Sequence, residues 1–195
     1  MKWETLTTIS VFRIDKKTLK QNIKKRKIMR KDLENYINEG RRRNVLCKKY
    51  DEMLADADTV REFFDAALGV QGIEFVCKSV RDGWFLPPSV VTQTFGRVIN
   101  GQYTHQGPGY TSKMYYRFNG GVLADTTAIC VIESNIGIKV PRNKNVRIYA
   151  AGECKIRIIG EGGAKLVFFG DESGLSLECN DAFVEKKYVE IVGEE

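Results

Sequence analysis

Residues 146–184 read VRIYAAGECKIRIIGEGGAKLVFFGDESGLSLECNDAFV, and this stretch decides the fold. In its short runs every second residue is apolar, and such alternation is typical of strands with one buried face. Corners separate the runs every ten residues, at Gly160-Glu161, Gly170-Asp171 and Asn180-Asp181. A strand and a turn at this spacing predict either stacked rungs of a β-solenoid or a meander of short hairpins. The residues predicted to face inward are Cys154, Ile156, Ile158, Ala164, Leu166, Phe168, Leu175, Leu177 and Cys179.

The composition is that of an ordinary globular protein, with 43% hydrophobic and 29% charged residues among 195. A chain of this length buries roughly 70% of its unfolded surface, so it needs no metal or disulfide to hold its core. The cysteines are odd in number and form no CxxC pair, so we expect buried, reduced thiols. They are Cys47, Cys77, Cys130, Cys154 and Cys179.

The N-terminal sequence lacks the basic and long apolar regions of a signal peptide, and no apolar run approaches the roughly 20 residues of a membrane span. We therefore expect no membrane association. The expected location is the cytoplasm of the producing cell or of an infected host cell, or a virion.

Local signals predict the elements of the first quarter. Residues 5–14 are rich in β-branched side chains and predict a strand. Apolar spacing over 15–40 predicts a helix that Gly40 would end, and residues 45–55 predict a second helix.

Stronger signals follow. Thr59 and Glu62 form a capping box that begins a third helix, which Gly69 would end. The sequence GIEFVCKSV (72–80) predicts a strand. Arg81-Asp82-Gly83 then predicts a turn.

Prolines and turn residues divide the middle of the chain. Pro87-Pro88 predicts a short helix through Phe95 or an extended passage, and Asn100-Gly101 predicts a hairpin turn. Loose alternation over Tyr110–Phe118 predicts a strand with one packed face.

These elements predict an α+β protein with two parts. Residues 1–57 form a basic, mainly helical segment. Residues 58–195 form an α+β domain with a small α/β middle, and its short-strand repeats, over about 140–190, make a solenoid-like or meander sheet.

Charge is the clearest functional signal. Residues 1–50 contain 16 Lys and Arg against 5 Asp and Glu, a net +11, whereas the remainder has 15 against 20, a net −5. Such asymmetry predicts an anionic partner for residues 15–50, either nucleic acid or an acidic protein, with a solvated helix face as the alternative. The candidate residues are Lys24, Lys25, Arg26, Lys27, Arg30, Lys31, Arg41, Arg42 and Arg43.

Aromatic residues are concentrated in the span 84–118, which predicts either an interaction surface or a core packed under the repeats. The candidate interface residues are Trp84, Tyr103, Tyr110, Tyr115 and Tyr116.

No catalytic or metal centre is predicted. His105 is the single histidine and lies in a Gly/Pro-containing stretch, so we expect an exposed loop residue and neither a metal nor a cofactor. Glu161, Asp171 and Asp181 recur at ten-residue spacing and would line one edge of a solenoid, either as turn residues or as a glycosidase-like carboxylate pair.

The order of helices, GIEFVCK (72–78) and a glycine-punctuated β tail resembles small proteins of unknown function encoded by phages and prophages. The resemblance covers residues 58–185 and implies an α/β head, a repeat tail and a viral or mobile-element origin. It implies no enzymatic activity and carries over no functional residues.

Three functions follow as hypotheses. The first is a non-enzymatic phage-type protein that binds an anionic partner, as a virion-associated or assembly component or an inhibitor of a host protein. The second is a purely self-assembling solenoid subunit, a dimer or trimer, because open strand edges recruit other chains. The third is a hydrolase of a glycan or polyanion.

Overall fold

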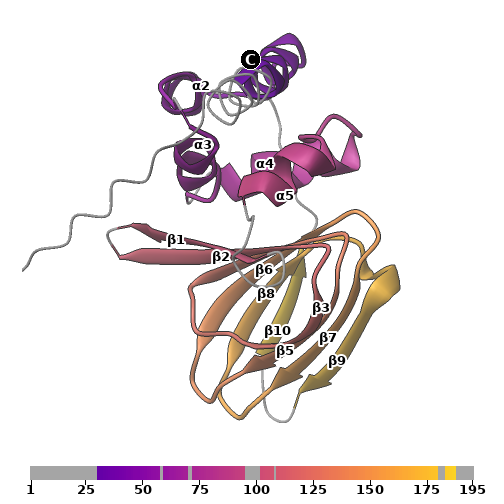
Figure 1. Cartoon of the computed structure of the whole chain (residues 1–195). Helices are drawn as coiled ribbons and strands as arrows, with labels where there is room; N and C mark the ends of the chain where they lie inside the picture. Colours follow the sequence, from indigo (N-terminus) through magenta and orange to yellow (C-terminus); the bar gives the residue numbers. More distant parts are fainter. Residues whose placement is uncertain are drawn as a thin grey trace, which may run out of the picture.

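The computed structural model describes residues 30–57, 59–69, 72–94, 102–107, 109–179 and 183–187. It shows two parts, a group of short helices and a β-solenoid beneath them (Figure 1). The predicted strand over 5–14, the first part of the predicted helix over 15–40 and the predicted Asn100-Gly101 turn lie outside the described residues.

The first described helix covers residues 30–42 and passes through Gly40, so the prediction that Gly40 ends it was wrong. Asn44 ends it instead, in the left-handed region at φ 52°, because the Val45 and Asn44 amides donate to the Gly40 and Arg41 carbonyls. Gly40 is needed for a close approach, since a Cβ there would lie 2.9 Å from Leu46 Cδ1 and from Phe75 Cζ.

Four further helices follow in the described residues, α2 (Lys48–Ala55), α3 (Val60–Ala67), α4 (Gly72–Arg81) and α5 (Pro88–Thr94). The capping box that begins α3 is confirmed, because the Thr59 side chain accepts from the Glu62 amide at 3.1 Å and Glu62 Oε2 accepts from the Thr59 amide at 2.9 Å. Of the two alternatives predicted at Pro87-Pro88, the structure shows the short helix, which begins at Pro88, while Phe95 lies outside the described residues.

The predicted strand over 72–80 was wrong, because this segment is α4. Ile73, Val76 and Cys77 are buried at the i, i+3, i+4 spacing of a helix face. Tertiary packing overrides the β-branched composition here. The turn predicted after it is confirmed, with Gly83 at φ 74°.

In the described part of the chain that follows there are ten strands, whose bounds are β1 (Gln102–Gly107), β2 (Tyr110–Tyr116), β3 (Asn119–Leu123), β4 (Ala128–Ile132), β5 (Asn135–Val140), β6 (Asn145–Ala151), β7 (Lys155–Gly160), β8 (Lys165–Phe169), β9 (Leu175–Cys179) and β10 (Phe183–Lys187). A short 3-10 helix, η2 (Glu172–Gly174), precedes β9. Sheet A has the order β1-β2-β4-β6-β8-β10, and sheet B has the order β3-β5-β7-β9.

Parallel pairing between successive rungs confirms the solenoid and excludes the meander. Asn135 pairs with Lys155 and Asn145 with Lys165, so the rungs that begin there take 20 residues each and hold two of the ten-residue units seen in the sequence. The chain crosses from sheet A to sheet B at one edge, here called the A-to-B edge, and returns at the B-to-A edge. Only β1 and β2 pair antiparallel among the described strands.

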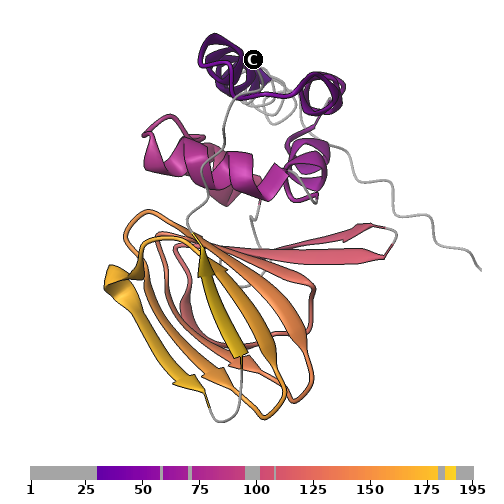
Figure 2. The same cartoon turned by 180° about the vertical axis from the view of Figure 1, so that it is seen from behind.

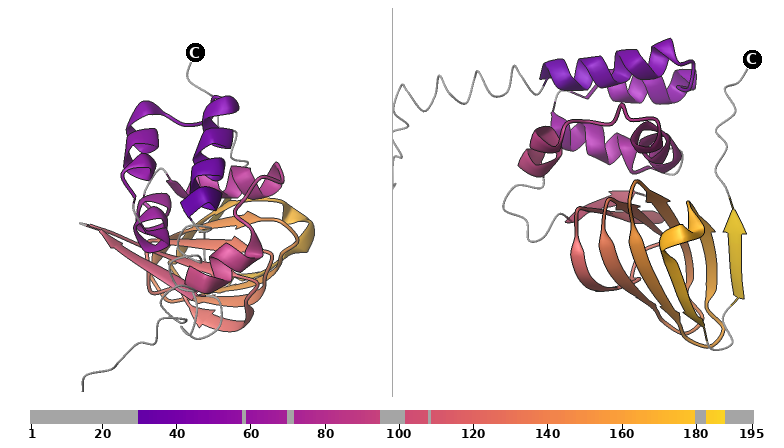
Figure 3. Two further views of the ribbon diagram at one scale, coloured as in Figure 1. Left: turned by 45° about the horizontal axis from the view of Figure 1, so that its top comes forward. Right: turned by 90° about the vertical axis from the view of Figure 1, so that its right-hand side faces the viewer.

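Two apolar clusters hold the layers together. The solenoid cluster fills the space between the sheets and includes Ile158, Leu166 and Phe168, each at most 1% exposed. The layer cluster joins the helices to the outer face of sheet A, where α4 lies against β4 and β6. Sheet A is therefore covered on both faces, as the side view in Figure 3 and the rear view in Figure 2 show.

Candidate binding surfaces

The predicted basic site divides into a described part and a part outside the description. Lys24, Lys25, Arg26 and Lys27 lie outside the described residues. Arg30 and Lys31 are exposed on the first described helix, and Arg30 Nε is 3.3 Å from Glu34 Oε1.

The three consecutive arginines after Gly40 have acidic partners within the chain. Arg41 Nε is 2.8 Å from Asp51 Oδ1, and Arg43 Nε is 2.7 Å from Glu39 Oε1. Arg42 also binds Glu39 through both its Nε and its Nη2. Hydrogen bonds from Arg42 and Arg43 lower the pKa of Glu39 to about 2. Arg41 therefore joins the first described helix to α2, and Arg43 also lies 3.7 Å from Asp82 after α4, whereas Arg42 pairs within its own helix. Less of the charge of these arginines is left for a partner.

Three lysines of the helical layer are exposed and have no carboxylate partner among the described residues. They are Lys31, predicted from the sequence, and Lys48 and Lys49 at the start of α2. The two lysines of α2 were missed because a pair of lysines is not distinctive by composition.

The candidate interface aromatics lie within the packing between the layers. Tyr115 (1% exposed) faces the solenoid interior and Tyr116 (3%) faces the helices, so both faces of β2 are packed rather than the one predicted. Trp84, Tyr103 and Tyr110 are half-buried against the layer cluster. Tyr115 and Tyr116 therefore fit the alternative prediction, that of a core packed under the repeats. The interface role stays a prediction for Trp84, Tyr103 and Tyr110.

His105 lies in β1 and not in a loop, so the prediction of an exposed loop residue was wrong. Its side chain is 17% exposed, and its Nδ1 is 3.6 Å from Asp65 Oδ1 on α3. The Tyr103 hydroxyl donates to the same carboxylate oxygen at 2.9 Å. Ser112, which faces His105 across the strand pair, donates to the Leu68 carbonyl at 2.7 Å. These contacts join β1 and β2 to α3. The Ser112 hydroxyl donates to a backbone carbonyl and not to the His105 imidazole, whereas the hydroxyl of a catalytic serine would be directed at the imidazole.

The acidic corners do not form one column. Glu161 follows β7 at the B-to-A edge, whereas Asp171 follows β8 at the A-to-B edge, because ten residues are half a rung. Lys139, with Nζ 2.9 Å from Glu161 Oε1, lowers the pKa of Glu161. Asp171 accepts from the Ser173 amide, and Asp181 lies outside the described residues. The proposed carboxylate pair was therefore wrong for Glu161 and Asp171.

A groove of about 790 Å³ does lie along the A-to-B edge, beside the C-terminal end of α4. Its charged lining residues are Arg81, Glu133, Glu153, Lys155 and Asp171. The sequence did not reveal this group, because its members come together only when rungs of 16 to 20 residues are stacked.

The corners that build this groove need left-handed backbone. Arg117 and Glu133 begin successive corners at φ 49° and 47°, and an ion pair of 2.7 Å joins their side chains. Gly152 occupies the next corner at φ 75°, where a Cβ would lie 2.9 Å from Glu133 Cγ. The groove thus has both signs of charge, and one of its carboxylates is already paired.

Within the described ranges, no group of three or more His, Cys, Asp or Glu side chains is arranged to hold a metal ion. None of the described helices is long and apolar enough to cross a membrane.

Comparison with known proteins found no matching family model, no similar curated protein and no similar solved structure.

Proposed function

We propose that the protein is a non-enzymatic binding protein, in which a β-solenoid scaffold carries a basic N-terminal segment that binds an anionic polymer, nucleic acid being the first candidate. The observation that carries this proposal is the segregation of charge, net +11 over residues 1–50 and net −5 over the remainder. A phage-type assembly or virion-associated role would use such a segment.

The ion pairs within the helical layer support different roles for different basic residues. Binding of a cation to a phosphate backbone is favourable because it releases condensed counterions. Arg41, Arg42 and Arg43 are held by Glu39 and Asp51 and would have to leave these carboxylates. We therefore assign binding to Lys24–Lys27 with Lys31, and a structural role to the three arginines.

Removing the charges of the two groups in separate variants tests this assignment. Replacing Lys24, Lys25, Arg26 and Lys27 together by Gln is expected to weaken binding to a short DNA duplex by roughly 10²-fold. It should also reduce the slope of log K against log salt by about 3–4. The measurement is fluorescence anisotropy from low to high salt.

The control variant replaces Arg41, Arg42 and Arg43 by Gln, and we expect its salt slope to change by less than about 1. Equal losses of DNA affinity in the two variants would contradict this assignment of roles. Unchanged binding in the first variant would end the proposal.

A second candidate function, self-assembly, is favoured by the C-terminal end of the solenoid. Among the described strands, sheet B ends at β9, whereas sheet A continues from β8 to β10, so β10 extends past β9. Among the described strands none pairs with the outer edge of β9 or β10. Leu175, Leu177 and Val184 of this last turn are only partly buried, whereas Ile156 and Ile158 are 3% and 0% exposed. Unpaired strand edges with apolar neighbours favour pairing with another strand.

The other end of the solenoid is covered differently. Lys113 lies in the inward row above Ile129, and its ammonium group meets Asp125 Oδ2 at 2.6 Å. This charged cover and the β1–β2 hairpin oppose stacking on the sheet A side of that end, whereas the outer edge of β3 pairs with no described strand. Self-assembly through the C-terminal end alone would give a closed oligomer.

Light scattering tests this second candidate. Wild-type protein is expected as a dimer or trimer whose mass is insensitive to salt, and Leu177→Lys is expected to dissociate it because a charge enters the apolar end. Ile159→Lys, on the exposed outer face of sheet B, is the control and should leave the mass unchanged. A monomeric wild-type protein at all concentrations would rule this function out.

A further inference from the structure

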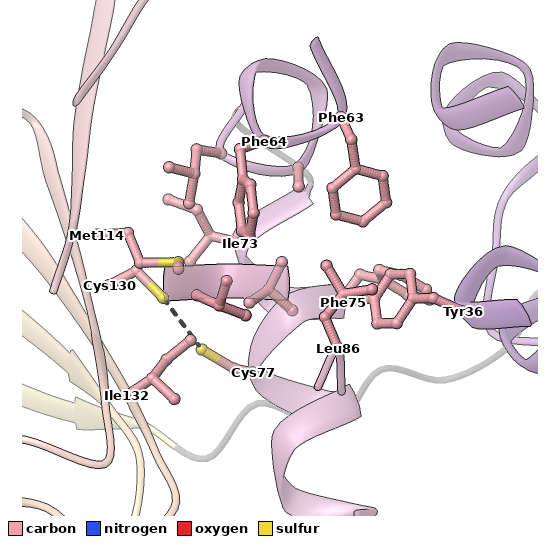
Figure 4. Close-up of a cluster of buried hydrophobic side chains, with 14 of the residues drawn as sticks. Tyr36, Phe63, Phe64, Ile73, Phe75, Cys77, Leu86, Met114, Cys130 and Ile132 are labelled. Atoms are coloured by element: carbon pink, nitrogen blue, oxygen red, sulfur yellow. Dashed lines mark hydrogen bonds between the residues drawn. The ribbon is translucent and has the colours of Figure 1, made fainter. Parts of the chain in front are cut away.

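Two cysteines from different layers face each other in the core. Cys77 projects from α4 and Cys130 from β4, and their sulfur atoms are 3.8 Å apart (Figure 4). Both thiols are free, and the side chains of Met114 and Ile132 lie beside them in the same cluster.

We propose that Cys77 and Cys130 are a redox-responsive pair that closes into a disulfide between the helical layer and sheet A when a peroxide oxidises them. A disulfide needs its sulfurs about 2.05 Å apart, so they must approach by about 1.8 Å. Side-chain rotation supplies a movement of this size, since both sulfurs already point into the same contact.

The chemistry balances with hydrogen peroxide as the oxidant. One thiolate attacks the O–O bond and becomes a sulfenic acid with release of hydroxide, which takes up the thiol proton as water. The second sulfur then displaces the sulfenic oxygen as a second water and forms the S–S bond. Two thiols and one peroxide thus give one disulfide and two water molecules.

Burial makes the pair selective for small oxidants. Cys77 is 3% exposed and Cys130 0%, so a bulky disulfide reagent has no access while the protein is folded. The hydrogen bond with Cys77, together with burial, raises the pKa of the Cys130 thiol. The thiolate is therefore scarce at neutral pH, and the oxidation rate should increase as pH rises.

The disulfide would join positions 53 residues apart and fasten α4 to β4. Closing a loop of this length restricts the unfolded chain, so we expect the melting temperature to increase by roughly 5–15 °C. Reduction with dithiothreitol should reverse the increase.

The experiment treats the folded, full-length protein with hydrogen peroxide at mildly alkaline pH and maps disulfide-linked peptides without reduction. The expected result is one intramolecular Cys77–Cys130 link and the loss of two titratable thiols. A variant with Cys47, Cys154 and Cys179 replaced by Ala should form the same link, and Cys130→Ala should lose both the link and the gain in melting temperature.

Mapping of disulfide-linked peptides in the wild-type protein tests the proposal without depending on how any variant folds. If Cys77 and Cys130 remain reduced while Cys47 or Cys154 is oxidised, the proposal is overturned. A Cys77–Cys130 link that forms only after denaturation overturns it as well.

Discussion

Gly72 shows how one residue sets the distance between two helices. It begins α4, and its amide donates to the Gly69 carbonyl at 3.1 Å. A Cβ at this position would collide with the Ala67 carbonyl oxygen and lie 2.8 Å from the Tyr50 hydroxyl oxygen. The absent side chain therefore allows α4 to start directly against the end of α3.

Gly72→Ala is expected to lower the free energy of unfolding by about 1–3 kcal/mol, because relief of this overlap requires the backbone to move. The higher helix propensity of Ala, about 1 kcal/mol, acts in the opposite direction and does not remove the clash. Urea denaturation measures the difference. Gly137→Ala in β5 is the control, since nothing lies within 4 Å of the added carbon, and its effect should be small.

At the scale of the element, each solenoid strand divides its residues between an interior and an outer face. In β7, Ile156 and Ile158 are buried while the residues between and beside them are exposed. Adjacent isoleucines at 158 and 159 thus experience different environments, at 0% and 36% exposure. The same side chain contributes to the core in one case and little in the other.

Ile158→Ala is expected to destabilise the protein by about 2–5 kcal/mol, because it leaves a cavity between the sheets. Ile159→Ala should cost about 1 kcal/mol or less, since it changes only exposed strand surface. The two variants are compared by chemical denaturation. Similar costs would contradict the assignment of faces in β7.

At the scale of the whole molecule, tyrosines are buried in both clusters, Tyr36 and Tyr50 of the helices in the layer cluster and Tyr115 in the solenoid cluster. Burial, with a smaller effect from Asp125, raises the pKa of Tyr115 to about 12. Burial also raises the pKa values of Tyr36 and Tyr50 above the ordinary range. The folded protein therefore keeps these phenols protonated in alkaline solution.

In alkaline solution stability should accordingly decrease from about pH 9, where the unfolded chain releases the thiol proton that Cys130 keeps in the fold, and more steeply above about pH 10. Above this pH the unfolded chain releases phenolic protons that the folded chain retains, so unfolding becomes more favourable as pH rises. Urea denaturation from pH 8 to 11, with the absorbance of tyrosinate as a second signal, measures the effect. Ionisation of all tyrosines in a protein that remains folded would contradict the burial assigned to them.

Local patterns predicted much of this architecture. The alternation after Val146 identified the inward residues Ile158, Leu166 and Phe168, and Thr59 with Glu62 identified the start of α3, because each signal involves residues that are neighbours on one strand or one helical turn. The sequence identified the candidate binding residues only by their positive charge, because composition does not show which of them form ion pairs with carboxylates.

The sequence alone therefore determined the α+β class, the basic first quarter and the repeated strands, because periodicity and composition act over a few residues. Only the tertiary structure decided that residues 72–80 form a helix, since the apolar surface of sheet A determines which face is buried. It also decided that Glu161 and Asp171 lie at opposite edges, because this depends on the closure of a 20-residue rung. The partners of Arg41 and Arg43, and the approach of Cys77 to Cys130, likewise exist only after the layers have packed.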